Sequence, residues 1–165
     1  MDVLLFDPIL RHFLTEDLEH GDITTDTIFG EADTTSTSFM ARHDMVACGM
    51  ASIAPRVFAL VDSGVRCTGA VADGALARQG DVLLRISGPT RAMLKGERVA
   101  LNLVQRMSGI ATRTRSFVDK IQGCRAAIVD TRKTTPGLRM LEKYQIIFHH
   151  DSSFRRLIRG QYHCG

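Results

Sequence analysis

A basic pair follows a short apolar run, and it is the strongest chemical signal in the sequence. Residues 126–129 are all apolar, Arg132 and Lys133 come soon after them, and Thr135 and Pro136 follow. We expect the apolar run to form a strand covered on both sides in a parallel sheet, and Thr135-Pro136 to cap and start a helix running to about residue 144. Two adjacent cations beside the positive N-terminal end of a helix are electrostatically unfavourable, and a bound anion would offset this cost. The pattern therefore predicts an anion site, and a solvated surface loop is the alternative.

A long helical pattern opens at Pro89, runs to about Gln122 and supplies a second basic feature. One face of it is apolar: Met93, Ala100, Val104, Met107 and Ala111. Another face is polar and mostly basic: Arg91, Lys95, Arg98, Asn102, Gln105 and Arg113. The spacing alone favours a solvated face or a helix-surface ion pair for Arg98. For the hydroxyl-rich residues 108–115 it favours a close-packed kink over a ligand contact.

Other groups that could do chemistry have simpler interpretations. Glu16 and Asp17 with Asp22 offer neighbouring carboxylates, but the glycine and threonines beside Asp22 indicate turn and cap chemistry. Four possible metal ligands match no standard spacing, so we predict no metal site from them: His149, His150, His163 and Cys164. The sequence contains no GxxxxGK[ST], GxGxxG, HExxH or GxSxG motif.

Charge is divided unequally along the 165 residues. Residues 1–90 hold six Lys or Arg against thirteen Asp or Glu, whereas residues 91–165 hold fifteen against five. Seventeen of the 21 basic residues are arginine, which suits carboxylate or phosphate partners, although a general arginine bias of the coding sequence would give the same count. Only Phe117 and Tyr144 are aromatic between residues 91 and 144, so small anions fit better than nucleic acid.

The compartment follows from two further features of the sequence. No apolar run approaches the roughly 18 residues that a membrane span needs, and residues 1–7 contain no basic segment typical of a secretory signal. The four cysteines form no CxxC pair and are expected to be reduced thiols. We therefore expect a cytoplasmic protein without a membrane partner.

The remaining elements predict an α+β module over the first 90 residues. A helix is expected over residues 8–19, ended by Gly21, and another over 51–61. Residues 35–42 and 45–49 are rich in β-forming types and suggest a hairpin turning at His43-Asp44. Two more short strands are expected at 65–71 and 82–86, joined through the turn dipeptides Asp73-Gly74 and Gly80-Asp81.

Six of these stretches together resemble quinolinate phosphoribosyltransferase, also called carboxylating nicotinate-nucleotide pyrophosphorylase. They are EDL at 16–18, GDITT at 21–25, GERVALN at 96–102, SGIAT at 108–112, DTRKTTPGLR at 130–139 and EKY at 142–144. The resemblance implies an N-terminal α/β sandwich domain with the long helix over residues 1–112. It implies the start of an incomplete α/β barrel over residues 113–165, with a divergent tail from about 145. It also implies a homodimer whose active sites draw on both subunits.

The resemblance further implies a reaction and a set of binding residues. Quinolinate and phosphoribosyl pyrophosphate would give nicotinate mononucleotide, pyrophosphate and CO₂, with Mg²⁺ as cofactor, in NAD biosynthesis. Arg132 and Lys133 match the pair that grips the substrate carboxylates, and Thr131 lies in the same loop. Arg98 matches the arginine that reaches quinolinate from the partner subunit, which reverses the interpretation from spacing. No catalytic residue and no Mg²⁺ ligand is assigned.

After Tyr144 the sequence departs from the family pattern. The family continues with a glycine-rich turn, a His-Arg pair and a Lys-Asp-Asn-His segment, and this chain has neither the turn nor that segment. Arg155 falls at the place of the family arginine, but Phe154 replaces the histidine, so Arg155 is assigned no role. A frame change or truncation would explain this, and we expect little turnover by the chain alone. The alternatives are a non-catalytic dimerisation or anion-binding module and a molybdenum-transport-associated paralogue.

Overall fold

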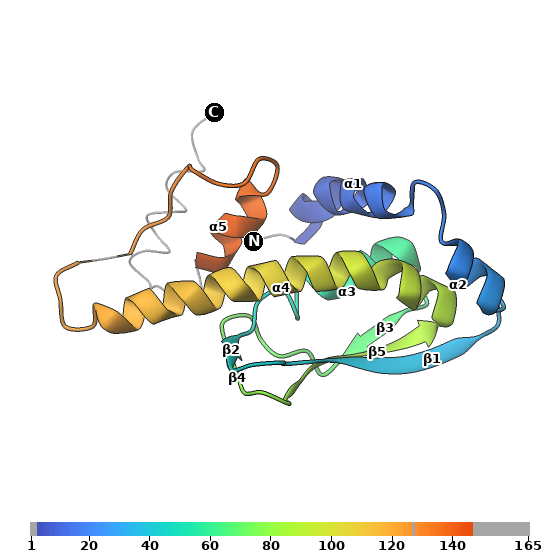
Figure 1. The fold of residues 1–165 in the computed structure, drawn as a ribbon, viewed down its shortest axis with the longest axis horizontal. Coiled ribbons are helices and arrows are strands. Elements are labelled where there is room, and N and C mark those ends of the chain that lie inside the picture. Colours follow the sequence, from blue (N-terminus) through green and yellow to red (C-terminus); the bar gives the residue numbers. More distant parts are fainter. Residues whose placement is uncertain (1–2, 127, 147–165) are drawn as a thin grey trace.

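One long helix organises the molecule, as a computed structural model that describes residues 3–126 and 128–146 shows (Figure 1). A sheet lies on one side of this helix, α1 lies on the other, and the last described helix, α5, packs near its far end (Figure 1). The helices are η1 (Val3–Phe6, 3-10), α1 (Asp7–Leu18), α2 (Ile23–Ile28), α3 (Ile53–Val61), α4 (Thr90–Lys120) and α5 (Arg139–Ile146). No helix of the described part is long and apolar enough to cross a membrane.

The strands form two small antiparallel sheets. One has the order β1-β5-β3, from Thr34–Met40, Val82–Pro89 and Arg66–Thr68, and the other pairs β2 (Met45–Val46) with β4 (Leu76–Ala77). The α+β character of the first 90 residues is confirmed, but the predicted hairpin is wrong.

The predicted hairpin fails because β1 pairs with β5 and not with β2. A bulge interrupts the β1–β5 register between Phe39 and Met40. Beyond it the Ala41 N–H donates to the Asp81 carbonyl at 2.9 Å, and the Gly80 N–H donates back to Ala41 at 2.9 Å. The chain therefore passes from one sheet to the other where a two-residue turn was expected.

The hydrophobic core lies between α4, α3, α1 and the sheets. The predicted apolar face of α4 is confirmed, since Met93, Ala100, Val104, Met107 and Ala111 are all buried. Helices α3 and α4 approach closely at Gly96, where an added Cβ would lie 2.8 Å from the Phe58 ring. Cys48 is fully buried in this core, and burial raises the pKa of its thiol.

Helix α4 runs through residues 108–115 without interruption, so the predicted kink is wrong. The close packing expected there is present. The buried Ser108 hydroxyl accepts from the Cys48 N–H at 3.0 Å and donates to the Cys48 carbonyl at 3.2 Å. The Thr112 hydroxyl accepts from the Val46 N–H at 2.9 Å and donates to the Ser108 carbonyl at 2.7 Å. These hydroxyls satisfy the backbone of an irregular segment without bending the helix.

The predicted strand over residues 126–129 is absent from the three of these residues that the structure describes. Residues 126, 128 and 129 have no strand assignment, and Val129 is 64% exposed. A parallel strand needs neighbours that pair with its N–H and C=O groups, and the described residues after α4 contain no other strand. The following helix begins at Arg139, so its predicted start at Thr135-Pro136 is wrong; those residues lie in a turn in which the Leu138 N–H donates to the Thr135 carbonyl at 3.0 Å. The division at residues 112 and 113 falls inside α4 and stays a prediction.

Candidate functional site

The loop that carries the basic pair is an ordered turn. The Thr131 hydroxyl accepts from the Lys133 N–H at 3.1 Å, and the Arg132 carbonyl accepts from the Thr134 N–H at 3.0 Å. The side chains of Arg132 and Lys133 are exposed, and no hydrogen bond or ion pair from another described residue reaches them. The loop thus presents two adjacent positive charges with their donors free for an anion.

The first turn of α5 holds this loop through its backbone and hydroxyl groups. Arg139 donates from Nε to the Thr134 hydroxyl at 3.2 Å and from Nη2 to the Arg132 carbonyl at 3.4 Å. Lys143 forms an ion pair with Asp130 at 2.8 Å, and both of these side chains are largely buried. The loop is therefore tied to α5 at its start and in its middle.

Arg106 on α4 closes the other end of the loop. Its guanidinium donates from Nε to Glu142 at 3.2 Å and from Nη2 to the Thr135 hydroxyl at 2.5 Å, while Glu142 also accepts from the Thr135 N–H at 3.1 Å. Burial alone would raise the pKa of Glu142, but the hydrogen bonds from Arg106 and Thr135 outweigh it and hold the pKa below its usual value. Glu142 therefore stays ionised and pins Thr135 to α4.

A carboxylate of the first 90 residues anchors the end of the same helix. Asp73 accepts from the Gly49 N–H at 2.7 Å, from the Ser52 hydroxyl at 2.7 Å and from the Tyr144 hydroxyl at 2.8 Å. The Tyr144 ring packs edge-on against Phe6 with 5.7 Å between centroids, and burial raises the pKa of the Tyr144 hydroxyl. The hydroxyl therefore remains a protonated donor to Asp73.

Arg98, the fourth predicted binding residue, lies elsewhere on α4. It pairs with Asp17 at 3.0 Å and with Asp22 at 3.5 Å, and its side chain is 51% exposed. Asp22 caps α2 through the Thr25 N–H at 3.0 Å, which confirms its predicted cap role. That hydrogen bond, with a smaller contribution from the positive charge of Arg98, lowers the pKa of Asp22.

The structure therefore brings Thr131, Arg132 and Lys133 together but leaves Arg98 apart from them. Arg98 precedes Arg106, which contacts the end of the loop, by eight residues, or about 12 Å of helix at 1.5 Å per residue. Spacing favoured a solvated face or a helix-surface ion pair for Arg98, and its observed ion-pair partners lie on α1 and beside α2 and not on α4 itself.

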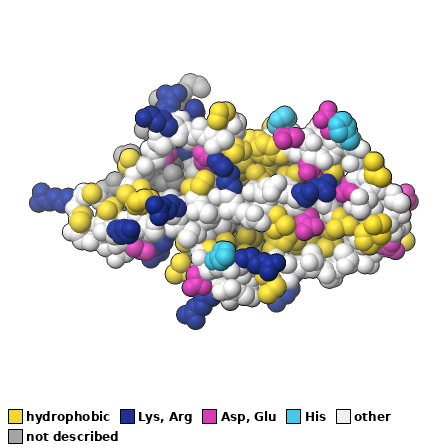
Figure 2. Space-filling view, viewed as in Figure 1, with side chains coloured by type: hydrophobic (Ala, Val, Ile, Leu, Met, Phe, Trp, Pro, Cys, Tyr) yellow, Lys and Arg dark blue, Asp and Glu magenta, His cyan; other side chains and the backbone are white. Residues whose placement is uncertain are grey.

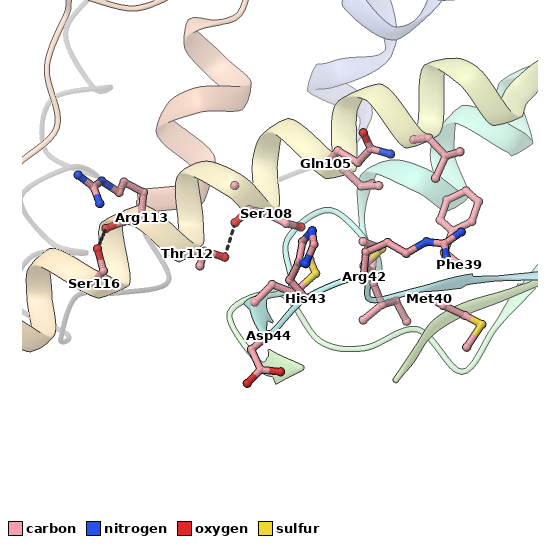
Figure 3. Close-up of a pocket in the computed structure, with 16 residues that line it drawn as sticks. Phe39, Met40, Arg42, His43, Asp44, Gln105, Ser108, Thr112, Arg113 and Ser116 are labelled. Atoms are coloured by element: carbon pink, nitrogen blue, oxygen red, sulfur yellow. Dashed lines mark hydrogen bonds between the residues drawn. The ribbon is translucent and has the colours of Figure 1, made fainter. Parts of the chain in front are cut away.

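A cavity of about 710 Å³ lies between α4 and the connection from β1 to β2 (Figure 3). Apolar residues such as Met50 and Val104 contribute to its lining, and Arg42, His43 and Gln105 supply polar groups (Figure 3). None of the four predicted binding residues lines it. It is separate from the basic loop.

Basic side chains cover the end of α4 and the segment after it, whereas acidic and histidine side chains gather over α1 (Figure 2). This distribution agrees with the charge division in the sequence. Within the described ranges no group of three His, Cys, Asp or Glu side chains could hold a metal ion. Arg155, Phe154 and the four ligands considered at 149, 150, 163 and 164 lie outside the described residues.

Sequence reasoning missed three contributors to the geometry of the loop. Arg106 follows Asn102 by four residues and continues the polar face of α4, so helical spacing could have found it. Asp73 was identified only as half of a turn dipeptide. Glu142 was part of a quoted motif without a role, because its two partners are 7 and 36 residues away.

Two family profiles match the chain in consecutive order. The N-terminal domain of quinolinate phosphoribosyl transferase matches residues 22–108, and the C-terminal domain of the same family matches residues 110–148. A probable nicotinate-nucleotide pyrophosphorylase (carboxylating) of Bacillus subtilis is 43% identical over 146 residues, which are 88% of this chain and 50% of that protein. The nicotinate-nucleotide pyrophosphorylase (carboxylating) of Mycobacterium leprae is 40% identical and covers 83% and 49%.

Solved structures agree with the sequence relatives. The NadC protein of Streptococcus pyogenes has a TM-score of 0.85 at 36% identity, over 90% of this chain and 53% of that one. The nicotinate-nucleotide pyrophosphorylase of Francisella tularensis has a TM-score of 0.82 at 30% identity, over 90% and 52%. This chain spans about half the length of the curated relatives it matches. On the profiles, the relatives and the fold together, the chain belongs to the quinolinate phosphoribosyl transferase family.

Proposed function

We propose that this chain supplies a quinolinate-binding part of a phosphoribosyltransferase of NAD biosynthesis. The reaction joins quinolinate to phosphoribosyl pyrophosphate and releases pyrophosphate and CO₂, leaving nicotinate mononucleotide. The observation that carries the proposal is the pair of exposed cations at Arg132 and Lys133, which have no side-chain partner among the described residues and lie in a loop whose backbone is fixed on both sides. The family membership supplies the substrate class.

The chemistry of the substrate suits this loop. Quinolinate carries two carboxylates on one aromatic ring, and a guanidinium with a neighbouring ammonium group can hold both of them in one plane. The ring nitrogen is then directed at C1 of the ribose, from which pyrophosphate departs. Once this nitrogen is alkylated, the electron pair that stays on the adjacent ring carbon as CO₂ leaves is stabilised by the positive ring nitrogen, and that carbon then takes up a proton from solvent. The described residues would serve binding and orientation in this scheme.

Arg98 has a place in the proposal as a donor to the site of a partner subunit. Its tie to Asp17 and Asp22, about 12 Å along α4 from Arg106, keeps it away from the loop of its own chain. The second carboxylate-binding arginine would then come from a second copy of the chain. A homodimer is therefore part of the proposal.

Two further parts of the proposal concern the cofactor and the compartment. Mg²⁺ is proposed for the complete reaction, but the described residues do not form a site that fits it, and no step is assigned to it. The thiols of Cys48, Cys67 and Cys124 are free. Free thiols are typical of reducing compartments, which supports the proposed cytoplasmic location.

Calorimetric titration with quinolinate tests the loop directly. We expect Arg132→Gln and Lys133→Gln each to weaken binding by about tenfold or more, the loss of one charge-assisted hydrogen bond. Arg125→Gln removes a cation from the exposed segment before the loop and is the matched control. Equal affinity in all four proteins would place the quinolinate site elsewhere.

Mixing two variants tests the shared site. Arg98→Gln and Arg132→Gln homodimers would each carry only damaged sites, whereas a mixed dimer would carry one intact site. Random exchange of subunits should restore about a quarter of the binding sites. If a monomeric form of the chain binds quinolinate with the affinity of the wild-type protein, the partner role of Arg98 is contradicted. Nicotinate mononucleotide formation by the purified chain would in turn contradict the expectation of little turnover.

A further inference from the structure

Three consecutive residues of α5 contact the start of the loop, its end together with α4, and the connection between β3 and β4. We propose that Glu142, Lys143 and Tyr144, the positioning triplet, set the place of Arg132 and Lys133 and so govern quinolinate affinity without touching the substrate. This inference rests on the proposed function and assigns roles to residues that act through others.

Helix geometry explains how adjacent residues can reach separate targets. Successive side chains on an α-helix are about 100° apart, so three of them cover roughly 200° of the helix surface. Glu142 faces Arg106 of α4 and Thr135 at the end of the loop. Lys143 faces Asp130 at the start of the loop, and Tyr144 faces Asp73 in the connection between β3 and β4.

The contact of Glu142 fixes the end of the loop. Its Oε2 accepts from the Thr135 N–H at 3.1 Å, and Arg106 contacts both its Oε1 and the Thr135 hydroxyl. The Thr135 N–H is thus held by the Glu142 carboxylate, and the Thr135 hydroxyl by the Arg106 guanidinium. The position of Thr135 relative to α4 follows from this pair.

The contact of Lys143 fixes the start of the loop. Lys143 Nζ lies 2.8 Å from Asp130 Oδ2, with the two side chains only 14% and 16% exposed. Charges screened so little by water attract each other more strongly than a surface pair does. Lys143 therefore fixes the position of Asp130. The described residues after α4 contain no neighbouring strand that could do so.

The contact of Tyr144 fixes α5 itself to the connection between β3 and β4. Its hydroxyl donates to Asp73 Oδ2, which also accepts from the Ser52 hydroxyl. The other oxygen, Asp73 Oδ1, accepts from the Gly49 N–H. The Asp73 side chain is therefore held in position by Gly49 and Ser52 independently of Tyr144. A rotation of α5 would break this hydrogen bond and carry the loop with it.

Apolar packing around the loop is sparse: among the described residues after Ala111, Leu138, Met140 and Tyr144 are only partly buried against the core. Leu141 is the only described hydrophobic residue after Ala111 that is fully buried, and Val129 beside the loop is exposed. A loop without a strand or a core of its own takes its position from polar contacts. The triplet provides them at both ends.

Variants that remove one polar group and keep the shape test the inference. Tyr144→Phe keeps the ring against Phe6 and loses only the hydroxyl, and Glu142→Gln keeps the volume and loses the charge. Arg115→Gln removes an exposed ion pair with Asp119 on α4 and is the matched control. Quinolinate affinity, the amide resonances of residues 131–135 without ligand, and the melting temperature are measured for each.

We expect Tyr144→Phe and Glu142→Gln to shift the loop amides and to weaken quinolinate binding roughly tenfold, since small misplacements of binding groups are costly. Arg115→Gln should change neither quantity. In Asp73→Asn the single remaining oxygen must face the Gly49 N–H, so Tyr144 loses this oxygen acceptor and the loop amides should shift as they do in Tyr144→Phe. Unshifted loop amides and unchanged affinity in both triplet variants, even with lower melting temperatures, would overturn the inference.

The two proposals fail in different ways. If Arg132→Gln leaves quinolinate binding intact, the proposed function fails whatever the triplet does. If Arg132→Gln abolishes binding while the triplet variants bind normally, the loop is the site and only the positioning role is wrong. If the wild-type chain does not bind quinolinate, the proposed function fails and the amide resonances alone decide whether the triplet places the loop.

Discussion

Two regions of the molecule are held together by different forces. In the first, residues 3–121, buried hydrophobic side chains run from Phe6 to Ala111 and include six that come from α1, α3 and η1: Phe6, Leu10, Leu14, Ile53, Val57 and Phe58. In the second, the described residues from 122 onward, Leu141 alone is a fully buried hydrophobic residue. There hydrogen bonds and ion pairs to α4 and to Asp73 dominate, and Leu138, Met140 and Tyr144 pack only partly buried against the core.

The comparison bears on stability and on function. Buried apolar side chains each contribute about 1.5–3 kcal/mol, whereas a partly exposed ion pair contributes about 0–1 kcal/mol. The second region should therefore open locally while the first stays folded. The cations proposed to bind the substrate lie in the region that opens more easily, and α4 provides the fixed surface beneath it.

The largest expected effect is a loss of folding stability in the first region. Phe58 is 1% exposed between α3 and α4, so Phe58→Ala should lower the free energy of unfolding by about 3–5 kcal/mol. Phe117 on the same long helix is 43% exposed, and Phe117→Ala should cost less than about 1 kcal/mol. Urea unfolding followed by circular dichroism measures both. Similar losses for the two variants would show that the core does not dominate stability.

An intermediate effect separates close packing from helix propensity within α4. Gly96→Ala places a methyl group 2.8 Å from the buried Phe58 ring and should cost about 1–3 kcal/mol despite the better helix propensity of alanine. At Gly109 an added Cβ meets nothing within 4 Å, so Gly109→Ala should stabilise by about 0.5–1 kcal/mol. Opposite signs of the two shifts in the urea midpoint are the expected result, and equal signs would contradict the close approach of α3.

The smallest expected effect is confined to the second region. Because the pKa of Glu142 is below its usual value in the folded chain, its contribution is complete above the ordinary pKa of glutamate, about 4.3, and is lost as pH falls through the folded value. Hydrogen exchange of α5, corrected for the intrinsic rate, should therefore speed up in this acid range by an amount equivalent to about 1 kcal/mol or less. Glu142→Gln should remove that dependence. An unchanged pH profile in the variant would assign it to another group.

The sequence predicted what apolar periodicity controls. The apolar face of α4 was correct at all five positions, and the helices at the N-terminus and at α3 were found within a few residues of their observed ends. Their side chains repeat at helical spacing, and burial rewards that repeat directly. The family motifs supplied the fold beyond this.

The sequence predicted less well what distant partners control. β1 was placed in a hairpin with its neighbour, whereas its partner β5 lies more than forty residues further along the chain. The strand over 126–129 was inferred from four apolar residues, although a strand requires neighbours that a local pattern cannot reveal. Arg132 and Lys133 were found because they are adjacent in sequence. Arg106 and Asp73 were missed because their partners are separated from them by 21 to 71 residues.

The burial of Cys48 has a consequence for the chemistry of the folded chain. Its thiol lies in the core, hydrogen bonds from Ser108 hold the backbone around it, and its pKa is raised by burial. Oxidants and alkylating reagents attack the thiolate, which this environment suppresses while also denying access. Cys124, exposed in the segment that follows α4, has no such protection. The same division that separates the core from the basic loop thus also separates a buried cysteine from an accessible one.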